Sequence, residues 1–196
     1  MTPKQTAIAL NGIDGKKVKA ICAFALKDNA LSILSTPFIY KKHLFATNQE
    51  VAVVIDCSSF LRISLDADKA YSLPAQILDK ALARDVFYLS ETSEGEKMLS
   101  KVGDSSAHLN DCTDKLSPIG DALLAMAQEK HDSEVNISSV GFAPALVKKV
   151  CALADAYNVS TMVFETVPQT KKSLPRLQVS FPAQAGVKAL VMPKRL

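Results

Sequence analysis

The clearest pattern of apolar and polar positions lies in the last third of the chain. Apolar side chains recur there at one helical spacing, at Leu146, Val147, Val150, Leu153, Ala154 and Tyr157. This spacing matches 3.6 residues per turn and predicts a helix over residues 144–157. The opposite face carries Lys148 and Lys149. Shorter apolar runs predict strands at residues 159–164, 177–181 and 187–192.

The first two thirds of the chain contain shorter apolar segments separated by turn-forming residues. Thr2 and Pro3 have the pattern of a helix start, and residues 11–12 end that helix. Apolar segments at 16–26 and 31–35 flank a polar stretch, which predicts a hairpin turn and a returning strand. Further strands are predicted at residues 51–56, 60–65, 86–89, 98–99 and 107–109.

Proline residues mark the start of two more predicted helices. The second helix begins at Pro74, and its apolar face consists of Ile77, Leu78, Ala81 and Leu82. The third begins at Pro118 with Ser117 as its N-cap. A strand at 135–140 is predicted to lead into the fourth helix.

The order of these elements predicts the fold class. Helix and strands alternate twice, which is typical of an α+β protein with antiparallel sheets and two helices per unit. The polar stretch 110–115 is the predicted boundary, so the chain divides into units 1–112 and 113–196. Only residues 128–139 lie between the third and fourth helices, which leaves room for about one strand in the second unit.

The C-terminal residues carry a resemblance to a known family. The chain ends Leu190-Val191-Met192-Pro193-Lys194-Arg195-Leu196, and Val140-Gly141-Phe142-Ala143-Pro144 opens the fourth helix. These segments resemble the bacterial sliding clamp, the beta subunit of the replicative DNA polymerase, which ends in Met-Pro-x-Arg-Leu. A second, fainter similarity lies in Leu73-Pro74-Ala75 and in residues 94–99. The resemblance implies a sliding-clamp-like fold, in which the short second unit is truncated or the third helix is not of the clamp type.

The resemblance also implies two sets of binding residues. In clamps, basic helices line the hole and contact the DNA backbone, a role that falls here to Lys80, Arg84, Lys148 and Lys149. Contact with phosphates needs only flexible cations and does not involve reading the bases. Cations on a helix face that is merely exposed to solvent have the same spacing, so that alternative stays open. The C-terminal residues of clamps line an apolar groove for partner peptides, which implies a peptide-binding role for Leu190, Val191, Met192 and Pro193. The alternative for these four is an edge strand that completes the sheet.

Composition narrows the class of protein. The chain has 196 residues, 48% of them hydrophobic, and a net charge of +3, which permits contact with nucleic acid without requiring it. No apolar run approaches the roughly 18 residues of a membrane span, and the N-terminus lacks the apolar core of a signal peptide. We therefore expect a cytoplasmic protein with no membrane contact. The four cysteines form no CxxC pair, so neither a metal site nor a disulfide framework is predicted.

Enzymatic alternatives find little support in the sequence. His108 and Cys112 are close in sequence, with Asp111 and Asp114 nearby, and a Cys/His pair can form a nucleophile. This segment is also polar and fits a linker. No nucleotide-binding, zinc-protease or serine-hydrolase motif is present. We predict no enzyme activity, no cofactor and no metal.

The resulting hypothesis is a non-catalytic clamp-like protein that tethers partner proteins on double-stranded DNA. Its partners would be a polymerase or other proteins with clamp-binding peptides. The alternative is a clamp-fold module that binds proteins or peptides without encircling DNA, and a small enzyme built on Cys112 and His108 is a third class. Clamps close six domains into a ring, so the resemblance implies a homo-oligomeric ring, and chains of two domains would need three copies, which puts a trimer ahead of a dimer.

Overall fold

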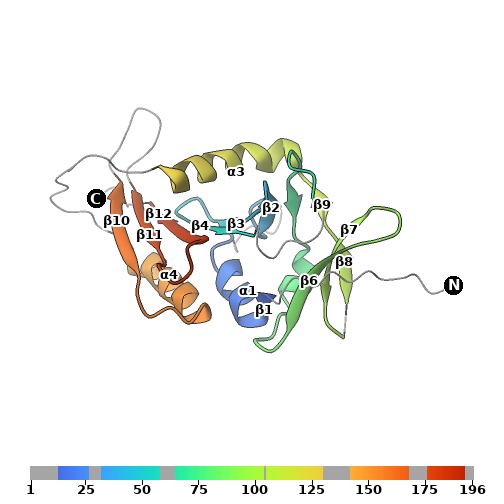
Figure 1. Cartoon of the computed structure of the whole chain (residues 1–196), viewed down its shortest axis with the longest axis horizontal. Helices are drawn as coiled ribbons and strands as arrows, with labels where there is room; N and C mark the ends of the chain where they lie inside the picture. Colours follow the sequence, from blue (N-terminus) through green and yellow to red (C-terminus); the bar gives the residue numbers. More distant parts are fainter. Residues whose placement is uncertain are drawn as a thin grey trace.

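The computed structural model describes residues 13–26, 32–57, 65–103, 105–129, 142–167 and 176–192. In these residues the chain repeats one arrangement three times, a helix followed by three antiparallel strands (Figure 1). We call each repeat an αβββ motif. Motif 1 consists of α1 (Gly15–Cys22), β2 (Phe38–Tyr40), β3 (His43–Thr47) and β4 (Val51–Asp56). Motif 2 consists of α2 (Ala75–Leu78), β6 (Val86–Glu91), β7 (Lys97–Lys101) and β8 (Ser106–His108). Motif 3 consists of α4 (Pro144–Ala156), β10 (Val163–Val167), β11 (Arg176–Ser180) and β12 (Val187–Val191).

Motifs 1 and 2 are joined by a reciprocal exchange of short strands. The strand that precedes α1, β1 (Ile13–Asp14), pairs with β6 of motif 2, with Ile13 opposite Phe87. The strand that precedes α2, β5 (Tyr71–Ser72), pairs with β2 of motif 1, with Tyr71 opposite Ile39. Each motif therefore completes the sheet of the other, and the two form one unit.

The strands form two antiparallel sheets. One has the order β1-β6-β7-β8, and the other has the order β10-β11-β12-β4-β3-β2-β5-β9, where β9 is Asn110–Asp111. Motif 3 is joined to motif 1 by the pairing of β12 with β4, in which Ala189 lies opposite Val53. A continuous sheet thus crosses the boundary predicted between residues 112 and 113. The division into units 1–112 and 113–196 stays a prediction.

The large sheet is covered by helices on both faces. Helices α1 and α4 lie side by side on one face, and α3 (Thr113–Gln128) crosses the other face (Figure 1). On the α1–α4 side the core includes Phe24, Val53, Val150 and Leu153. On the α3 side it includes Phe38, Phe45, Leu116 and Leu190. Because both faces are covered, the central strands are nearly continuous apolar runs, as in β4 and β12.

Several predicted elements are confirmed. The fourth helix spans Pro144–Ala156 with Leu146, Val150 and Leu153 buried, as its periodicity predicts. The strands predicted at 51–56, 86–89, 98–99 and 187–192 correspond to β4, β6, β7 and β12. The predictions for residues 2–11, 27–30, 135–140 and most of 60–65 lie outside the described residues.

Three predicted elements are wrong. The returning strand predicted at 31–35 is one of them, because residues 32–36 form turns and bends. The segment 16–26 is not a hairpin strand, because α1 begins at Gly15, where the Asp14 carboxylate accepts a hydrogen bond of 2.9 Å from the Lys17 backbone N–H. Its apolar residues face one side at helical spacing. The third helix begins at Thr113, and Pro118 lies inside it. The Asp111 carboxylate, which accepts bonds from both the N–H and the hydroxyl of Thr113, provides this earlier start.

Candidate DNA-facing surface and peptide groove

Helix α1 is basic on its outer face. Lys16 and Lys19 are exposed and Lys17 is half-buried, while Val18 and Ile21 point into the core. This separation follows from the sequence once residues 15–22 are helical, because the lysines and the apolar residues fall on opposite sides. The sequence analysis missed these cations because it predicted a strand there. The signal that could have found them is Asp14, an N-cap residue directly before a run of lysines.

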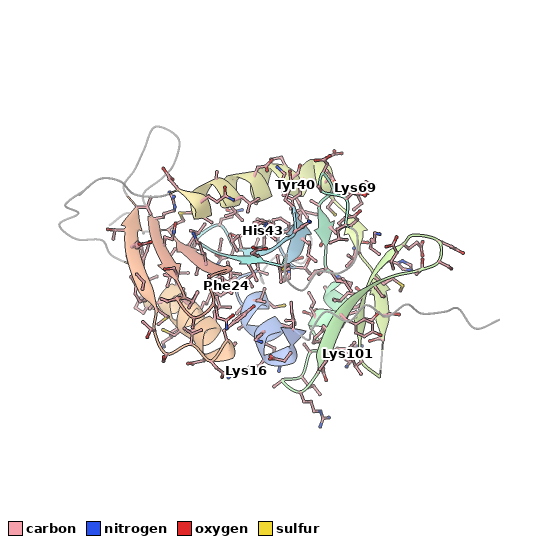
Figure 2. The ribbon with its side chains drawn as sticks, in the orientation of Figure 1. Lys16, Phe24, Tyr40, His43, Lys69 and Lys101 are labelled. Atoms are coloured by element: carbon pink, nitrogen blue, oxygen red, sulfur yellow. The ribbon has the colours of Figure 1, made fainter. Side chains whose placement is uncertain are left out.

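Helix α4, which packs beside α1, carries a second pair of cations. Lys148 is exposed and Lys149 is half-buried, opposite the buried face of the helix. The two helices are cross-linked, because Lys16 Nζ donates a hydrogen bond of 2.7 Å to the Asp155 carbonyl oxygen. That carbonyl lies in the last turn of α4, where a cation is favoured by the helix dipole. Figure 2 shows Lys16 on the side of the molecule opposite α3.

Lys17 and Tyr157 make a second link between these helices. Lys17 Nζ lies 5.2 Å from the centre of the Tyr157 ring and 3.5 Å from the Asp14 carboxylate. Burial raises the pKa of the Tyr157 phenol, so the ring is neutral at physiological pH. These contacts fix the spacing of α1 and α4, and both helices carry exposed lysines. We call Lys16, Lys19 and Lys148 with their helices the α1–α4 surface.

The two other predicted DNA-binding residues have a different setting. The spacing of Lys80 and Arg84 predicted one shared helix face, but α2 ends at Leu78, and both residues lie in turns before β6. That part of the prediction is wrong, because the helix is only four residues long. Both side chains are exposed. Their role in binding DNA remains a prediction.

The predicted peptide-binding residues lie at the end of β12. Leu190 and Val191 are fully buried, on opposite faces of the sheet, opposite Ala52 and Val51 of β4. Met192 is half-buried, and its N–H donates to the Glu50 carbonyl oxygen at 2.8 Å. Pro193 lies outside the described residues. The edge-strand alternative is wrong, because β12 lies between β11 and β4.

The residues of the enzymatic alternative have separate surroundings. The His108 imidazole is exposed and its Nδ1 lies 3.5 Å from a Glu96 carboxylate oxygen, while Cys112, the N-cap residue of α3, is half-buried against the core on the α3 side. No hydrogen bond or ion pair joins Cys112 to His108 in the described part of the chain. The Thr113 hydroxyl and N–H, from which Asp111 accepts hydrogen bonds, lower the pKa of this carboxyl group, and Lys69 pairs with it at 3.3 Å.

Two further searches cover the described residues only. Their His, Cys, Asp and Glu side chains form no group of three that could hold a metal ion. None of their helices is long and apolar enough to cross a membrane.

Three repeated motifs, reciprocal strand exchange and a sheet that continues between units define a sliding-clamp fold. Solved clamp structures match most of this chain. They include the DNA polymerase III beta subunit of Thermotoga maritima (12% identity, TM-score 0.57, 91% of this chain) and the beta clamp of Helicobacter pylori (11% identity, TM-score 0.52, 100% of this chain). The beta sliding clamp of C. crescentus is a third (12% identity, TM-score 0.51, 93% of this chain). The predicted fold class, α+β and sliding-clamp-like, is confirmed.

The chain is shorter than these structures. It spans 61% of the Thermotoga chain, 63% of the C. crescentus chain and 67% of the Helicobacter chain. No family model matches the sequence, and no curated protein matches it either. At these identities the likeness shows the fold, and the function has to be argued from the residues.

Proposed function

We propose that this protein is a non-catalytic sliding-clamp-like protein that holds partner proteins on double-stranded DNA. The observation that carries the proposal is the α1–α4 surface. Two helices lie side by side on one face of a clamp sheet (Figure 1), and Lys16, Lys19 and Lys148 on them are exposed. The proposed place of action is the cytoplasm.

The chemistry of this surface suits the DNA backbone. Lys16, Lys19 and Lys148 are exposed, flexible cations on two packed helices. Such a surface neutralises phosphates and releases counterions, so its affinity depends on salt and hardly on sequence. Lys149, Lys80 and Arg84 are proposed to add to the same contact.

Partner binding is proposed at the end of β12. Leu190 and Val191 anchor the strand in the core, so Met192 follows a rigid base, and Pro193 is proposed to belong to the same site. An apolar, adaptable Met at such a position suits a short peptide of a polymerase or another clamp-binding protein. The second candidate function is a module that binds such peptides without encircling DNA. The observation that favours it is the pairing of β12 with β4 of the same chain, because this end of the strand is held in place without a ring.

Charge reversal tests the DNA contact. Lys19→Glu and Lys148→Glu change two exposed lysines of the α1–α4 surface, and Lys115→Glu makes the same change on α3, across the sheet. We expect each of the first two variants to weaken binding to any duplex and to lower the salt slope by about 1 per lost contact. Lys115→Glu has the same net charge and should match the parent protein. If all three variants lose the same amount of affinity for duplex DNA, the effect depends on net charge alone, and that result would contradict the proposal.

Topology separates the clamp from the module. A closed ring stays on covalently closed circular DNA and slides off when the circle is cut once. We expect self-association into a ring to make retention on DNA depend on circularity at moderate salt. Equal retention on circular and linear DNA would contradict encirclement and favour the module.

A further inference from the structure

A cavity and a cleft adjoin one another where motifs 1 and 2 meet. The cavity has a volume of about 40 Å³ and lies among α1, α2 and the two sheets. Its walls include Val18 and Ile21 of α1, Ile39 of β2, Leu89 of β6 and Leu99 of β7. All the described residues that line it are apolar or are cysteines, so a ligand meets no charged side chain there.

The cleft lies between α1 and α2 and has a volume of about 610 Å³. This volume falls in the range of roughly 300–1,000 Å³ that is typical of small-molecule sites. Cys22, Pro37 and Leu78 line both the cleft and the cavity. The cavity is therefore the apolar inner end of the cleft.

The size and polarity of the cavity select a short aliphatic group. A buried water needs two to four polar partners, and the Cys57 thiol at the wall already donates to the Ile55 carbonyl oxygen at 3.5 Å. The volume of about 40 Å³ exceeds the roughly 10–15 Å³ that one water needs and is well below the roughly 150 Å³ of an apolar cavity that takes benzene. The end of a branched aliphatic chain fits this range, whereas an aromatic ring is too large.

The cleft carries one charge of each sign among its described residues. Lys19 lies on α1, and Asp79 follows α2 directly. Both side chains are exposed, and no ion pair joins the two in the described part of the chain. An ammonium group and a carboxylate in one cleft can form charge-assisted hydrogen bonds to a ligand that carries both charges. They therefore favour a zwitterion over a simple acid or amine.

We propose that this cleft binds a free aliphatic α-amino acid of the size of valine or leucine. Its carboxylate pairs with Lys19, its ammonium group pairs with Asp79, and its side chain enters the cavity. A residue at a peptide end carries only one of these two charges, so the site selects the free compound. The inference goes beyond the proposed function, and neither DNA nor a ring enters it.

A size series of amino acids tests the cavity in the unaltered protein. Calorimetric titration with glycine, alanine, valine, leucine and phenylalanine, each up to millimolar concentration, measures the affinities. We expect valine and leucine to bind and the other three to bind at least about tenfold more weakly, because glycine and alanine leave the cavity unfilled and the phenylalanine ring exceeds it. Absence of binding by both valine and leucine, or phenylalanine binding as tightly as leucine, would overturn the proposal.

Blocked forms of leucine test the two charges and stand for the two ends of a peptide. Leucinamide lacks the carboxylate and N-acetyl-leucine lacks the ammonium group. We expect each to bind at least about tenfold more weakly than leucine, because each loses one charge-assisted hydrogen bond. Undiminished binding of either compound would mean that the site accepts a peptide end, and it would contradict the proposal.

Matched variants place the ligand in the cleft. Lys19→Gln and Asp79→Asn should each weaken leucine binding by a similar factor. Lys42→Gln is the control, because Lys42 is an exposed lysine of the β2–β3 turn that does not line the cleft. Undiminished affinity in the first two variants, or an equal loss in Lys42→Gln, would overturn the proposal. Lys19 also belongs to the α1–α4 surface, but these titrations contain no DNA, so failure of the DNA proposal leaves them unchanged.

Discussion

Gly120 of α3 lies directly against the ring of Tyr40 on β2. A Cβ atom at Gly120 would lie 2.5 Å from Tyr40 Cδ1. The next residue of the helix, Asp121, accepts a hydrogen bond from the Tyr40 hydroxyl at 3.3 Å and pairs with Lys41 Nζ at 2.7 Å. The hydrogen bond from Lys41 to the Asp121 carboxylate is the main reason why the pKa of the Lys41 ammonium is raised. Gly120 and Asp121 thus hold α3 against β2 and the turn that follows it.

The first prediction concerns this contact. Alanine is favoured over glycine inside a helix by about 1 kcal/mol, so Gly120→Ala would stabilise a free helix. Here the added methyl group meets a buried ring, and overpacking of that kind costs about 1–3 kcal/mol. We expect a net loss of free energy of unfolding in urea. Pairing Gly120→Ala with Tyr40→Leu should recover part of the loss, and a Gly120→Ala protein more stable than the parent would contradict the contact.

The second prediction concerns the β2–β3 turn. Its two residues, Lys41 and Lys42, have φ of 46° and 61°, the left-handed region that favours glycine. Lys42 is exposed, whereas Lys41 holds Asp121, so Lys42 is the residue to change. We expect Lys42→Gly to stabilise the protein by about 0.5–1 kcal/mol in urea unfolding, because it removes the left-handed strain. Ala122→Gly, at an exposed site inside α3, should instead cost about 1 kcal/mol. If both changes destabilise equally, turn strain is absent.

Sequence patterns predicted the elements whose signal is local. The periodicity of Leu146, Val150 and Leu153 placed α4 to within one residue, and with it Lys148 and Lys149. The three lysines around Val18 were missed, because helix and strand patterns are hard to separate in so short a segment. Their helix is fixed by Asp14, a cap that the apolar pattern does not contain.

Pairings between distant residues could not be predicted in the same way. Residues 187–192 were predicted as a strand, but nothing in that run indicates β4 as its partner. An edge strand was one alternative for the same residues, and the pairing with β4 puts β12 in the middle of the sheet. The burial of Leu190 and Val191 follows from this pairing and from α3, which are both long-range features.

The third prediction concerns Arg176, whose side chain is fully buried beneath the end of α3. Its Nη2 donates to the Met126 carbonyl oxygen at 2.8 Å and to a Glu129 carboxylate oxygen at 2.6 Å. Its Nε and Nη1 have no hydrogen-bond partner in the described part of the chain. This side chain joins β11 to the C-terminal end of α3, where cations are favoured.

Size and charge at Arg176 can be tested separately. We expect Arg176→Ala to cost about 3–5 kcal/mol in urea unfolding, because it leaves a cavity and removes the partner of Glu129. Arg176→Met should cost clearly less, since it fills the space and Glu129, which is a third exposed, can be hydrated. Equal losses in the two variants would mean that the ion pair, and not the volume, stabilises this end of α3.

The fourth prediction concerns Cys57 and alkaline pH. Burial raises the pKa of the Cys57 thiol from an ordinary 9.0 to about 12. Below 9.0 the thiol is protonated in both the folded and the unfolded chain, so its full contribution is present there. Between 9.0 and about 12 the unfolded chain releases the proton and the folded chain keeps it. The ionisation of this group therefore lowers the free energy of unfolding by up to about 1.4 kcal/mol per pH unit.

Urea unfolding across this pH range tests the prediction. We expect the free energy of unfolding to decline less steeply with pH for Cys57→Ala than for the parent protein. A cavity left by the variant would lower its stability at every pH and would not change this slope. Tyr157, whose pKa is also raised by burial, contributes in the same direction, so Tyr157→Phe should reduce the decline independently. Parallel pH profiles for the parent and Cys57→Ala would contradict a buried, protonated thiol, as would alkylation of Cys57 in the folded protein at the rate of a free thiol.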